Sequence, residues 1–215
     1  MQRIVLTGGP AAGKTAVLDV LRKHLAGEVV VLPESATMLF SGGFPRPSDA
    51  TGKRLVQRAI WQVQVSLEEL FQQEHPDRPH LCDRGTLDGA AYWPGGPERF
   101  LASMGTTLAS EYRRYDAVLF LETSAYSDAQ YPSDNPVRIE SPAQARALDA
   151  RLQEVWKGHP GFHLIGHQAN FYEKVALVLI ELHRVLGVGN AVSQRLARSV
   201  TESGTARRRK GRRRR

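Results

Sequence analysis

The sequence predicts an α/β protein in which a parallel sheet carries helices on both faces. Short apolar runs alternate with longer amphipathic segments along most of the 215 residues, the pattern of repeated strand–helix–strand units. Most of the short runs are rich in branched residues and show no alternation with polar residues, so both faces of each strand are expected to be buried. The first run leads directly into a glycine-rich segment that opens an amphipathic helix.

Five apolar runs are expected to form the strands. They comprise residues 4–6, 29–32, 80–82, 117–121 and 162–165. Parallel strands need crossover connections, which are right-handed in nearly all proteins. Successive crossovers therefore place helices on the two faces of this sheet.

Four amphipathic helices are predicted from apolar side chains that recur every three or four residues. Their apolar positions span residues 17–25, 56–70, 148–155 and 175–186, and the second stripe belongs to a long helix over residues 52–75. Ser141 followed by Gln144 is a capping box, with Pro142 at the first helical position. Asn170 followed by Glu173 marks a second helix start.

Composition excludes several other classes of protein. With 41% hydrophobic and 24% charged residues, the chain is neither globally disordered nor fibrous. The single cysteine, Cys82, excludes a disulfide scaffold and a cysteine-rich zinc site, and it suits a reducing compartment. The longest apolar run, residues 175–180, is far shorter than the ~20 residues of a membrane span, and the N-terminus does not resemble a signal peptide. We therefore expect no transmembrane segment and a cytoplasmic location.

Positive charge is concentrated at the C-terminal end of the chain. Eight of the nine residues 207–215 are Lys or Arg, and without them the formal net charge would fall from +7 to −1. We expect a folded body over residues 1–188, a marginal helix or linker over residues 189–200 and a disordered tail over residues 201–215. The tail is expected either to bind nucleic acid or anionic lipid without sequence preference or to be a neutral extension.

The strongest functional signal is an unbroken match to G-x-x-x-x-G-K-[ST] at residues 8–15. Its glycines let consecutive backbone N–H groups face one centre, where they bind phosphate together with the positive end of the following helix. Lys14 is expected to contact the β- and γ-phosphates, and the Thr15 hydroxyl to bind Mg²⁺. The residues expected to bind ATP or GTP are Gly8, Gly9, Pro10, Ala11, Ala12, Gly13, Lys14, Thr15 and Ala16.

Three further segments indicate which family of P-loop proteins the chain resembles. They are Leu32-Pro33-Glu34, Cys82-Asp83-Arg84-Gly85-Thr86-Leu87-Asp88 and Val137-Arg138-Ile139-Glu140. With the phosphate loop, they resemble the P-loop NTPases of the nicotinamide-riboside-kinase-like, AAA-type ATP-binding domain family, which is related to nucleoside and nucleotide kinases. The resemblance covers residues 2–186. It implies a three-layer fold with a five-stranded parallel sheet in the order 2-3-1-4-5, flanked by helices, and it does not extend to the AAA+ motors.

Glu34 and Asp83 each follow a predicted strand, at the edge where open α/β sheets bind ligands. The resemblance to nucleoside kinases implies that one of the two accepts the proton of the attacking hydroxyl. Asp83 is also the expected Mg²⁺ ligand, directly or through water. The alternative for both is a structural position at a helix start. Arg84 is expected to contact a phosphate or to form a structural ion pair, and Asp88 to bind hydroxyls of the acceptor.

Phosphoryl transfer needs positive charge on the moving group and exclusion of water. Residues 124–140 and the helix after them are expected to form a lid, with Arg138 as its main arginine and Arg146 as the next candidate. The turn at residues 166–170 is expected to hold the base of the nucleotide. The long helix over residues 52–75 is expected to line the acceptor pocket with Arg54, Gln57, Trp61 and Gln64.

These features predict a kinase that transfers the γ-phosphate of ATP to a hydroxyl of a nucleoside, a nucleotide or a similar metabolite. The predicted catalytic residues are Lys14, Glu34, Asp83, Arg84 and Arg138, and the predicted metal ligands are Thr15 and Asp83. Two other functions stay open. One is a nucleotide-dependent switch or weak NTPase that acts through a partner. The other is an RNA- or membrane-associated factor in which the tail is the working part.

Overall fold

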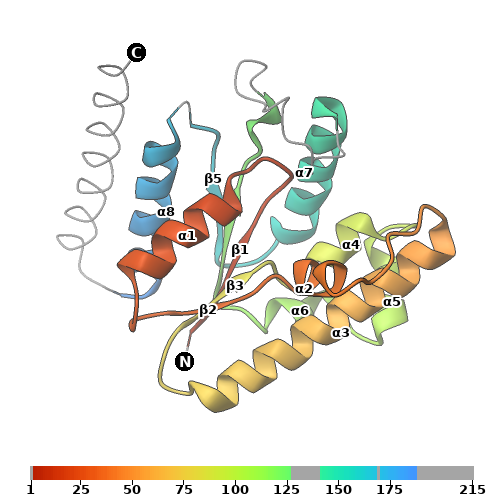
Figure 1. Cartoon of the computed structure of the whole chain (residues 1–215), viewed down its shortest axis with the longest axis horizontal. Helices are drawn as coiled ribbons and strands as arrows, with labels where there is room; N and C mark the ends of the chain where they lie inside the picture. Colours follow the sequence, from red (N-terminus) through yellow and green to blue (C-terminus); the bar gives the residue numbers. More distant parts are fainter. Residues whose placement is uncertain (1, 127–140, 169, 188–215) are drawn as a thin grey trace.

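Five parallel strands form the centre of the molecule (Figure 1). The computed structural model describes residues 2–126, 141–168 and 170–187. The strands are β1 (Arg3–Thr7), β2 (Val30–Leu32), β3 (His80–Asp83), β4 (Ala117–Leu121) and β5 (Phe162–Ile165). Their order in the sheet is β2-β3-β1-β4-β5, and every neighbouring pair is parallel. The predicted fold class and strand order are therefore confirmed.

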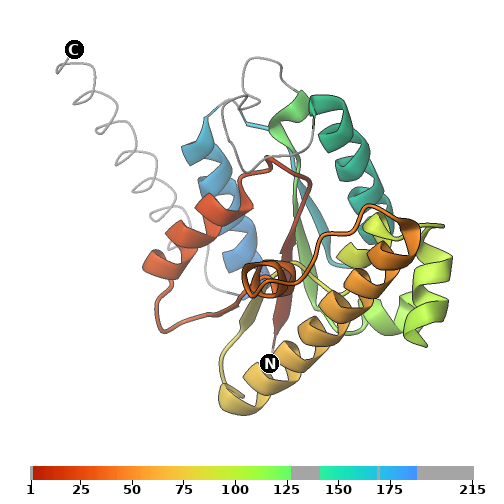
Figure 2. The ribbon, with the colours of Figure 1, turned by 45° about the vertical axis from the view of Figure 1, so that its right-hand side comes forward.

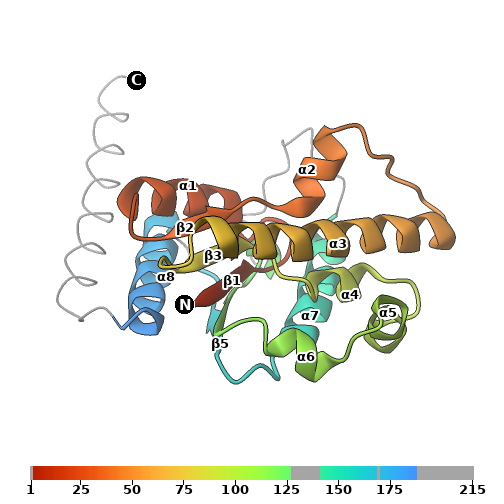
Figure 3. The ribbon, with the colours of Figure 1, turned by 90° about the horizontal axis from the view of Figure 1, so that it is seen from below.

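Helices cover both faces of the sheet, as Figures 2 and 3 show from two directions. One face carries α1 (Lys14–His24) and α8 (Phe171–Val185). The other face carries α3 (Ala50–Glu74), α4 (Asp88–Tyr92), α5 (Pro97–Met104), α6 (Leu108–Tyr112) and α7 (Pro142–Trp156). The short helix α2 (Ser35–Ser41) packs against α3, and a 3₁₀ turn, η1 (Ser124–Tyr126), follows β4.

Side chains of the strands point alternately into two apolar layers. Ile4 and Leu6 of β1 are buried in the layer that contains α1 and α8. Val5, between them, is buried in the layer formed with the helices of the opposite face. Because both faces are covered, consecutive strand residues must all be apolar, which explains the continuous runs in the sequence.

Two helix starts have the caps that the sequence predicts. At α7, the Ser141 side chain accepts a hydrogen bond from the Gln144 backbone and the Gln144 side chain accepts one from the Ser141 backbone. At α8, the Asn170 side chain accepts a hydrogen bond from the backbone of Tyr172. These bonds satisfy backbone N–H groups that have no partner inside the helix.

The buried stripe of α3 differs from the predicted one. Its fully buried residues are Val56, Gln64 and Glu68, whereas Leu70, which belongs to the predicted apolar stripe, is 47% exposed. Apolar periodicity did not identify this face because two of its buried positions are polar. Burial of those polar groups requires partners, and these are described with the site.

Two helices, α5 and α6, were not expected from the sequence. Pro97 at the start of α5, Gly105 in the left-handed conformation at its end and Thr107 at the cap of α6 are the local signals for them. Each helix buries a single residue of its own, so neither shows an apolar period that reasoning from sequence could detect.

Several sequence predictions lie outside the described residues. These are Arg138 with most of the proposed lid, the linker over residues 189–200 and the tail over residues 201–215. Among the described helices, none is both long enough and apolar enough to span a membrane.

Candidate functional site

All five strands end at the same edge of the sheet, because all run parallel. The phosphate loop follows β1, Glu34 follows β2, and Asp83 and Arg84 stand at the end of β3. The register pairs Leu6 with Asp83 and Leu32 with Cys82, so the segments after β1, β2 and β3 emerge side by side. The sheet thus gathers the predicted catalytic residues of the described chain at one edge.

Glycines allow the phosphate loop to lie flat against the end of β4. Gly8 has a φ of 141°, and a Cβ atom at this position would stand 2.0 Å from the carbonyl oxygen of Leu121. Gly13 adopts the left-handed conformation with a φ of 86°, which lets α1 begin at Lys14 directly after the turn. The two glycines of the motif therefore have separate steric causes: close approach at Gly8 and a left-handed turn at Gly13.

Side chains from other elements bind the carbonyl groups of the loop. The Thr123 hydroxyl donates to the Pro10 carbonyl, and the Ser124 hydroxyl donates to the Ala11 carbonyl. The buried ammonium of Lys174 donates to the Ala12 carbonyl at 3.2 Å and to the Glu122 carbonyl at 2.8 Å. These contacts hold the carbonyl groups of Pro10, Ala11 and Ala12 from outside the loop.

The Lys14 side chain folds back onto the phosphate loop. Its Nζ atom donates to the carbonyl oxygens of Gly8 at 2.6 Å and Gly9 at 3.1 Å. Burial, reinforced by the nearby Arg84 guanidinium, lowers the pKa of Lys14 to about 8, although carboxylates at the same edge act in the opposite direction. A bound polyphosphate would supply the negative charge that favours the ammonium form.

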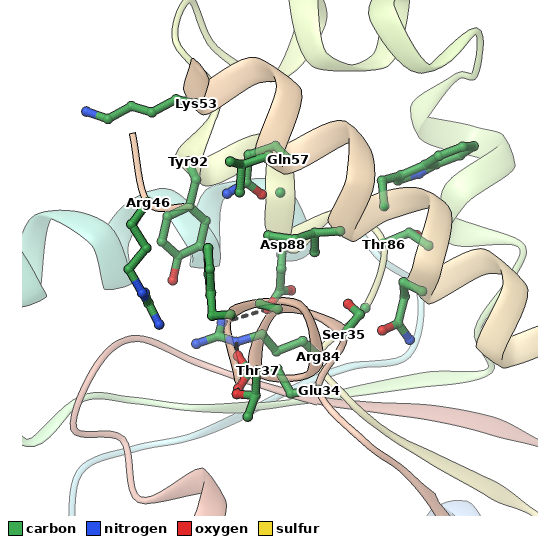
Figure 4. A pocket seen from close by; sticks show the side chains of 18 of the residues that line it. Glu34, Ser35, Thr37, Arg46, Lys53, Gln57, Arg84, Thr86, Asp88 and Tyr92 are labelled. Atoms are coloured by element: carbon green, nitrogen blue, oxygen red, sulfur yellow. Dashed lines mark hydrogen bonds and ion pairs between the residues drawn. The ribbon is translucent and has the colours of Figure 1, made fainter. Parts of the chain in front are cut away.

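Arg84 lies between two carboxylates, as Figure 4 shows. Its Nε atom donates to Glu34 at 2.5 Å, and its Nη1 atom donates to Asp88 at 2.9 Å. Burial works to raise the pKa of Glu34, but Arg84, the Thr37 hydroxyl and Lys14 together hold that pKa below its usual range. Glu34 is therefore a carboxylate that is ionised and hydrogen-bonded before any substrate arrives.

The Asp88 carboxylate accepts three hydrogen bonds from other side chains. Its Oδ2 atom accepts from the Thr7 hydroxyl at 2.6 Å and from Arg84, and its Oδ1 atom accepts from the Trp156 indole at 2.7 Å. The residue is buried. These contacts make Asp88 a link between β1, β3 and α7. Asp88 also lines the pocket described below, and its binding of acceptor hydroxyls stays a prediction.

Asp83 differs from its neighbours because its carboxylate accepts no hydrogen bond from the residues that the structure describes. Burial and the adjacent Glu34 carboxylate raise its pKa to about 6, while Lys14 and Arg84 limit the increase. A carboxylate destabilised in this way gains from a cation. Asp83 and the exposed hydroxyl of Thr15 are oxygen donors of the kind that Mg²⁺ takes together with phosphates and water, so the pair fits this ion. Within the described residues, no group of three or more His, Cys, Asp and Glu side chains is arranged to hold a metal.

A pocket of about 390 Å³ opens beside the Glu34–Arg84 pair (Figure 4). Its walls come from the start of α2, from α3 and from the segment that leads into α4. The predicted lining residues Gln57, Trp61 and Gln64 are in its wall, and Arg54 is not. Arg46, whose guanidinium lies 3.7 Å above the ring of Phe40, and Lys53 also line it.

The wall of this pocket includes a glutamine with a fixed orientation. The Gln64 amide donates from Nε2 to Oε1 of Glu68 at 3.0 Å. Glu68 is fully buried and also accepts hydrogen bonds from Tyr115, Arg114 and Arg3. A carboxylate can only accept from the amide, so the Gln64 NH₂ group must face Glu68. The Oε1 atom of Gln64 has no partner in the described part of the chain.

Three contributors to the site were missed by reasoning from sequence: Thr123, Asp149 and Lys174. Asp149 is fully buried and accepts hydrogen bonds from the backbone N–H groups of Gly9 and Thr123. A signal for it was present, because Asp149 lies beside the predicted apolar positions of its helix. Lys174 had the same signal, since it precedes the apolar Val175 in the first turn of α8.

The remaining candidates have other positions. Arg146, the second candidate for a lid arginine, donates to the carbonyl of Ala125 at 2.7 Å, next to η1. Further along the same helix, Arg151 donates to the carbonyl of Ala91 at 3.0 Å. In the turn after β5, the backbone N–H of His167 donates to the Glu122 carboxylate at 2.8 Å. This turn therefore lies beside the end of β4, at the same edge as the phosphate loop.

A family model described as AAA domain matches residues 3–171. No curated protein has a significant sequence match to the chain.

Solved structures show the same fold at low sequence identity. Deoxyadenosine kinase from M. mycoides, solved with bound dATP and also with its products, superposes with a TM-score of 0.53 at 12% identity, over 85% of this chain and 100% of the other. Thymidylate kinase from Candida albicans superposes with a TM-score of 0.57 at 15% identity, over 87% of this chain and 92% of the other. These values establish a fold shared with nucleoside and nucleotide kinases.

Proposed function

The chain belongs to the AAA domain family, and we propose that within it this protein is a small-molecule kinase. It would transfer the γ-phosphate of ATP to a hydroxyl group of a nucleoside, a nucleotide or a similar metabolite. The observation that carries the proposal is the position of the 390 Å³ pocket, which includes Glu34 and Arg84 and opens at the same sheet edge as the phosphate loop. A phosphate site and an acceptor pocket at one edge are what in-line transfer between two bound molecules requires.

The residues at this edge divide the work of phosphoryl transfer. Lys14 supplies positive charge to the phosphates from inside the loop. Glu34, ionised and restrained by Arg84, is placed in the acceptor pocket to take the proton of the attacking hydroxyl. Asp83 is the second candidate for this base, because a pKa of about 6 gives it more basicity than an ordinary carboxylate.

Thr15 and Asp83 are the residues that would hold Mg²⁺ together with the nucleotide phosphates. The bound ion supplies neutralisation of charge on the phosphoryl group. A carboxylate can serve as metal ligand or as base at one time, so assigning Asp83 to the ion leaves Glu34 as the base. Arg84, in contact with Glu34 and Asp88, orients the base and adds positive charge near the transferred group.

Gln64 supports an acceptor that carries a hydrogen-bond donor. Its NH₂ group is bound to Glu68, so its carbonyl oxygen, buried in the pocket wall and without a partner among the described residues, is the group that a ligand would engage. The amino or imino group of a nucleobase is such a donor, and Trp61 in the same wall offers an apolar surface to a planar ring. A nucleoside-like acceptor therefore fits this wall better than a small polyol.

The test is a screen for acceptor-dependent ADP release from MgATP, with nucleosides, nucleoside monophosphates and vitamin ribosides as acceptors. Wild-type protein should release ADP in a one-to-one ratio with a phosphorylated acceptor, and Glu34→Gln should lose this activity while still binding ADP. A matched GTP series decides between ATP and GTP. Slow ADP release without any acceptor dependence would favour a nucleotide-dependent switch or weak NTPase instead.

A separate proposal concerns the basic segment at residues 207–215. Eight Lys or Arg in nine residues give a charge density that suits polyanions such as nucleic acid or an anionic lipid surface. Binding should weaken steeply between about 50 and 200 mM salt, because counterions are released from the polyanion. The full chain and a chain ending at residue 200 should differ in binding to RNA and to anionic vesicles but not in binding to ADP. The cytoplasmic location stays a prediction.

A further inference from the structure

Asp149 contacts the phosphate loop from a helix more than a hundred residues further along the chain. Its Oδ1 atom accepts hydrogen bonds from the backbone N–H of Gly9 at 2.8 Å and from the backbone N–H of Thr123 at 3.2 Å. The hydroxyl of Thr123 in turn donates to the carbonyl of Pro10. One carboxylate oxygen therefore connects the phosphate loop to the end of β4.

The contact between Gly9 and Asp149 leaves no spare room. A Cβ atom at position 9 would stand 2.5 Å from the Oδ1 atom and 2.8 Å from the Cβ atom of Asp149. The carboxylate therefore lies directly against the loop backbone, which explains a second glycine after Gly8. The N–H group of Gly9 donates to Asp149 in the free protein.

The helix that carries Asp149 is itself bound to the acceptor side of the molecule. Trp156 of α7 donates to the carboxylate of Asp88, and Arg151 of α7 donates to the carbonyl of Ala91 in α4. Both contacts lie on the side of α7 that packs against α4. Helix α7 thus connects the phosphate loop with the helix that borders the acceptor pocket.

We propose that Asp149 is a positioning residue that fixes the shape of the phosphate loop by accepting hydrogen bonds from Gly9 and Thr123, and that this shape sets the affinity for nucleotide phosphates. The inference rests on the proposed function only in taking the loop to bind such phosphates. A loop held in its binding shape loses less conformational entropy when a ligand arrives, so the hydrogen bonds raise affinity without touching the ligand.

The geometry distinguishes a positioning residue from a base or a metal ligand. Asp149 is 0% exposed, and its Oδ1 atom already accepts from two backbone donors. Its other oxygen, Oδ2, is also buried and has no partner among the described residues. Asp149 needs only a carbonyl-like oxygen at the Oδ1 position to accept these two hydrogen bonds, and it needs no charge. An asparagine side chain at position 149 should therefore preserve the function.

The experiment measures the affinity of the full-length protein for two probes, ADP and inorganic pyrophosphate, by calorimetry. Asp149→Ala should weaken both affinities at least tenfold, because the loop loses its support. Asp149→Asn keeps an oxygen at the Oδ1 position and should stay within threefold of wild type. Thermal unfolding of each variant is recorded in parallel.

His159→Ala is the matched control for loss of stability. His159 is buried, hydrogen-bonds the carbonyl groups of Tyr112 and Tyr115, and precedes β5 at the opposite end of the strands from the loop. It should lower the melting temperature and leave ADP and pyrophosphate affinity within threefold of wild type. A parallel fall in both affinities for His159→Ala would show that general destabilisation is sufficient, which would overturn the inference.

Two further outcomes would overturn it: unchanged affinities in Asp149→Ala, or a loss in Asp149→Asn as large as in Asp149→Ala, which would assign the effect to charge. In either case wild-type binding of ADP would leave the proposed function standing. Conversely, the variants could show the expected affinities while the wild-type protein phosphorylates no acceptor. That result would support the role of Asp149 and contradict the proposal that the protein is a kinase.

Discussion

Arg84 donates a hydrogen bond to Glu34 at 2.5 Å, which joins two residues that are 50 positions apart in the chain. The Arg84 backbone is in the left-handed region, with a φ of 72°, where residues other than glycine are uncommon. This backbone conformation persists because the Arg84 guanidinium is bound by Glu34 and Asp88 and its N–H donates to the carbonyl of Leu6. The strained residue and its two carboxylates form the boundary between phosphate loop and acceptor pocket.

The first prediction separates the proposed base, Glu34, from the proposed metal ligand, Asp83, by kinetics. Glu34→Gln should lower kcat by about 10²- to 10⁴-fold, the usual contribution of a general base, and leave ADP affinity unchanged. Asp83→Asn should lower both turnover and the affinity for Mg²⁺–nucleotide, because it removes an oxygen ligand. Steady-state kinetics and calorimetry of the two variants provide the measurement. Full activity in both would remove these residues from the mechanism.

The second prediction uses the pH dependence of the same two carboxylates. Because the pKa of Asp83 is raised to about 6, an enzyme with Asp83 as its base should lose kcat/KM as pH falls through 6. The pKa of Glu34 lies below its usual range, so an enzyme with Glu34 as its base should keep kcat/KM constant there. We expect the flat profile between pH 5.5 and 7.5 at saturating Mg²⁺. A decline near pH 6 that is absent from Asp83→Asn would show that ionised Asp83 is required, as base or as metal ligand, and would contradict the expectation of a flat profile.

The third prediction concerns a proton taken up by Lys14. With a pKa of about 8, the free Lys14 side chain is half protonated at pH 8, and bound phosphate favours the charged form. ADP binding at pH 8 should therefore take up about half a proton, and close to none at pH 6.5. Calorimetry in buffers of different ionisation enthalpy measures this number. Lys14→Met should bind weakly and show no uptake, and equal uptake in both proteins would contradict the assignment.

The fold was predictable because its signals are local. The phosphate-loop motif and the continuous apolar runs identify the strands, and the observed bounds of β4 and β5 are those predicted. Glu68 and Asp149 could not be placed in the same way. Each is a charged residue on a buried helix face, and each is stable there only through partners from distant parts of the chain: Arg114 for Glu68 and Gly9 for Asp149. The apolar period can place such a residue on a buried face, but its partner depends on the assembled sheet and cannot be identified from the sequence.

The fourth prediction concerns a buried histidine in α8. Both ring nitrogens of His183 are buried without a hydrogen-bond partner among the described residues, and burial lowers the pKa of the ring. A lowered folded-state pKa means that stability is lost as pH falls through about 6.5, since the unfolded chain gains protons first. His183→Leu should raise the melting temperature at pH 7 by a few degrees, and by more at pH 5.5. Thermal scans with His24→Leu as the exposed control test this, and an equal effect at both pH values would contradict it.

The last prediction is that Asp83, the proposed metal ligand, lowers the stability of the free protein. Its pKa is about 6 in the folded chain against about 3.9 in an unfolded chain, so folding favours the protonated form. The stability contributed by that form is complete below about pH 4 and is lost as pH rises from about 4 to about 6. Above that range the ionised group costs about 1–2 kcal/mol, allowing for its partial exposure. Asp83→Asn removes the charge, so it should raise the melting temperature by about 3–6 °C at pH 7.5.

The gain from Asp83→Asn should shrink toward zero as the pH of the thermal scan is lowered from 7.5 to 4. Asp19→Asn is the control, because the Asp19 side chain is 60% exposed and its charge is already solvated. Mg²⁺ with ADP should reverse the order of the two proteins, since the cation stabilises the wild-type carboxylate and the variant has lost that ligand. If the variant gained stability equally at every pH, the charge of Asp83 would not be the cause of the destabilisation. If the variant were still the more stable protein with Mg²⁺ and ADP bound, the ion would not stabilise the Asp83 carboxylate.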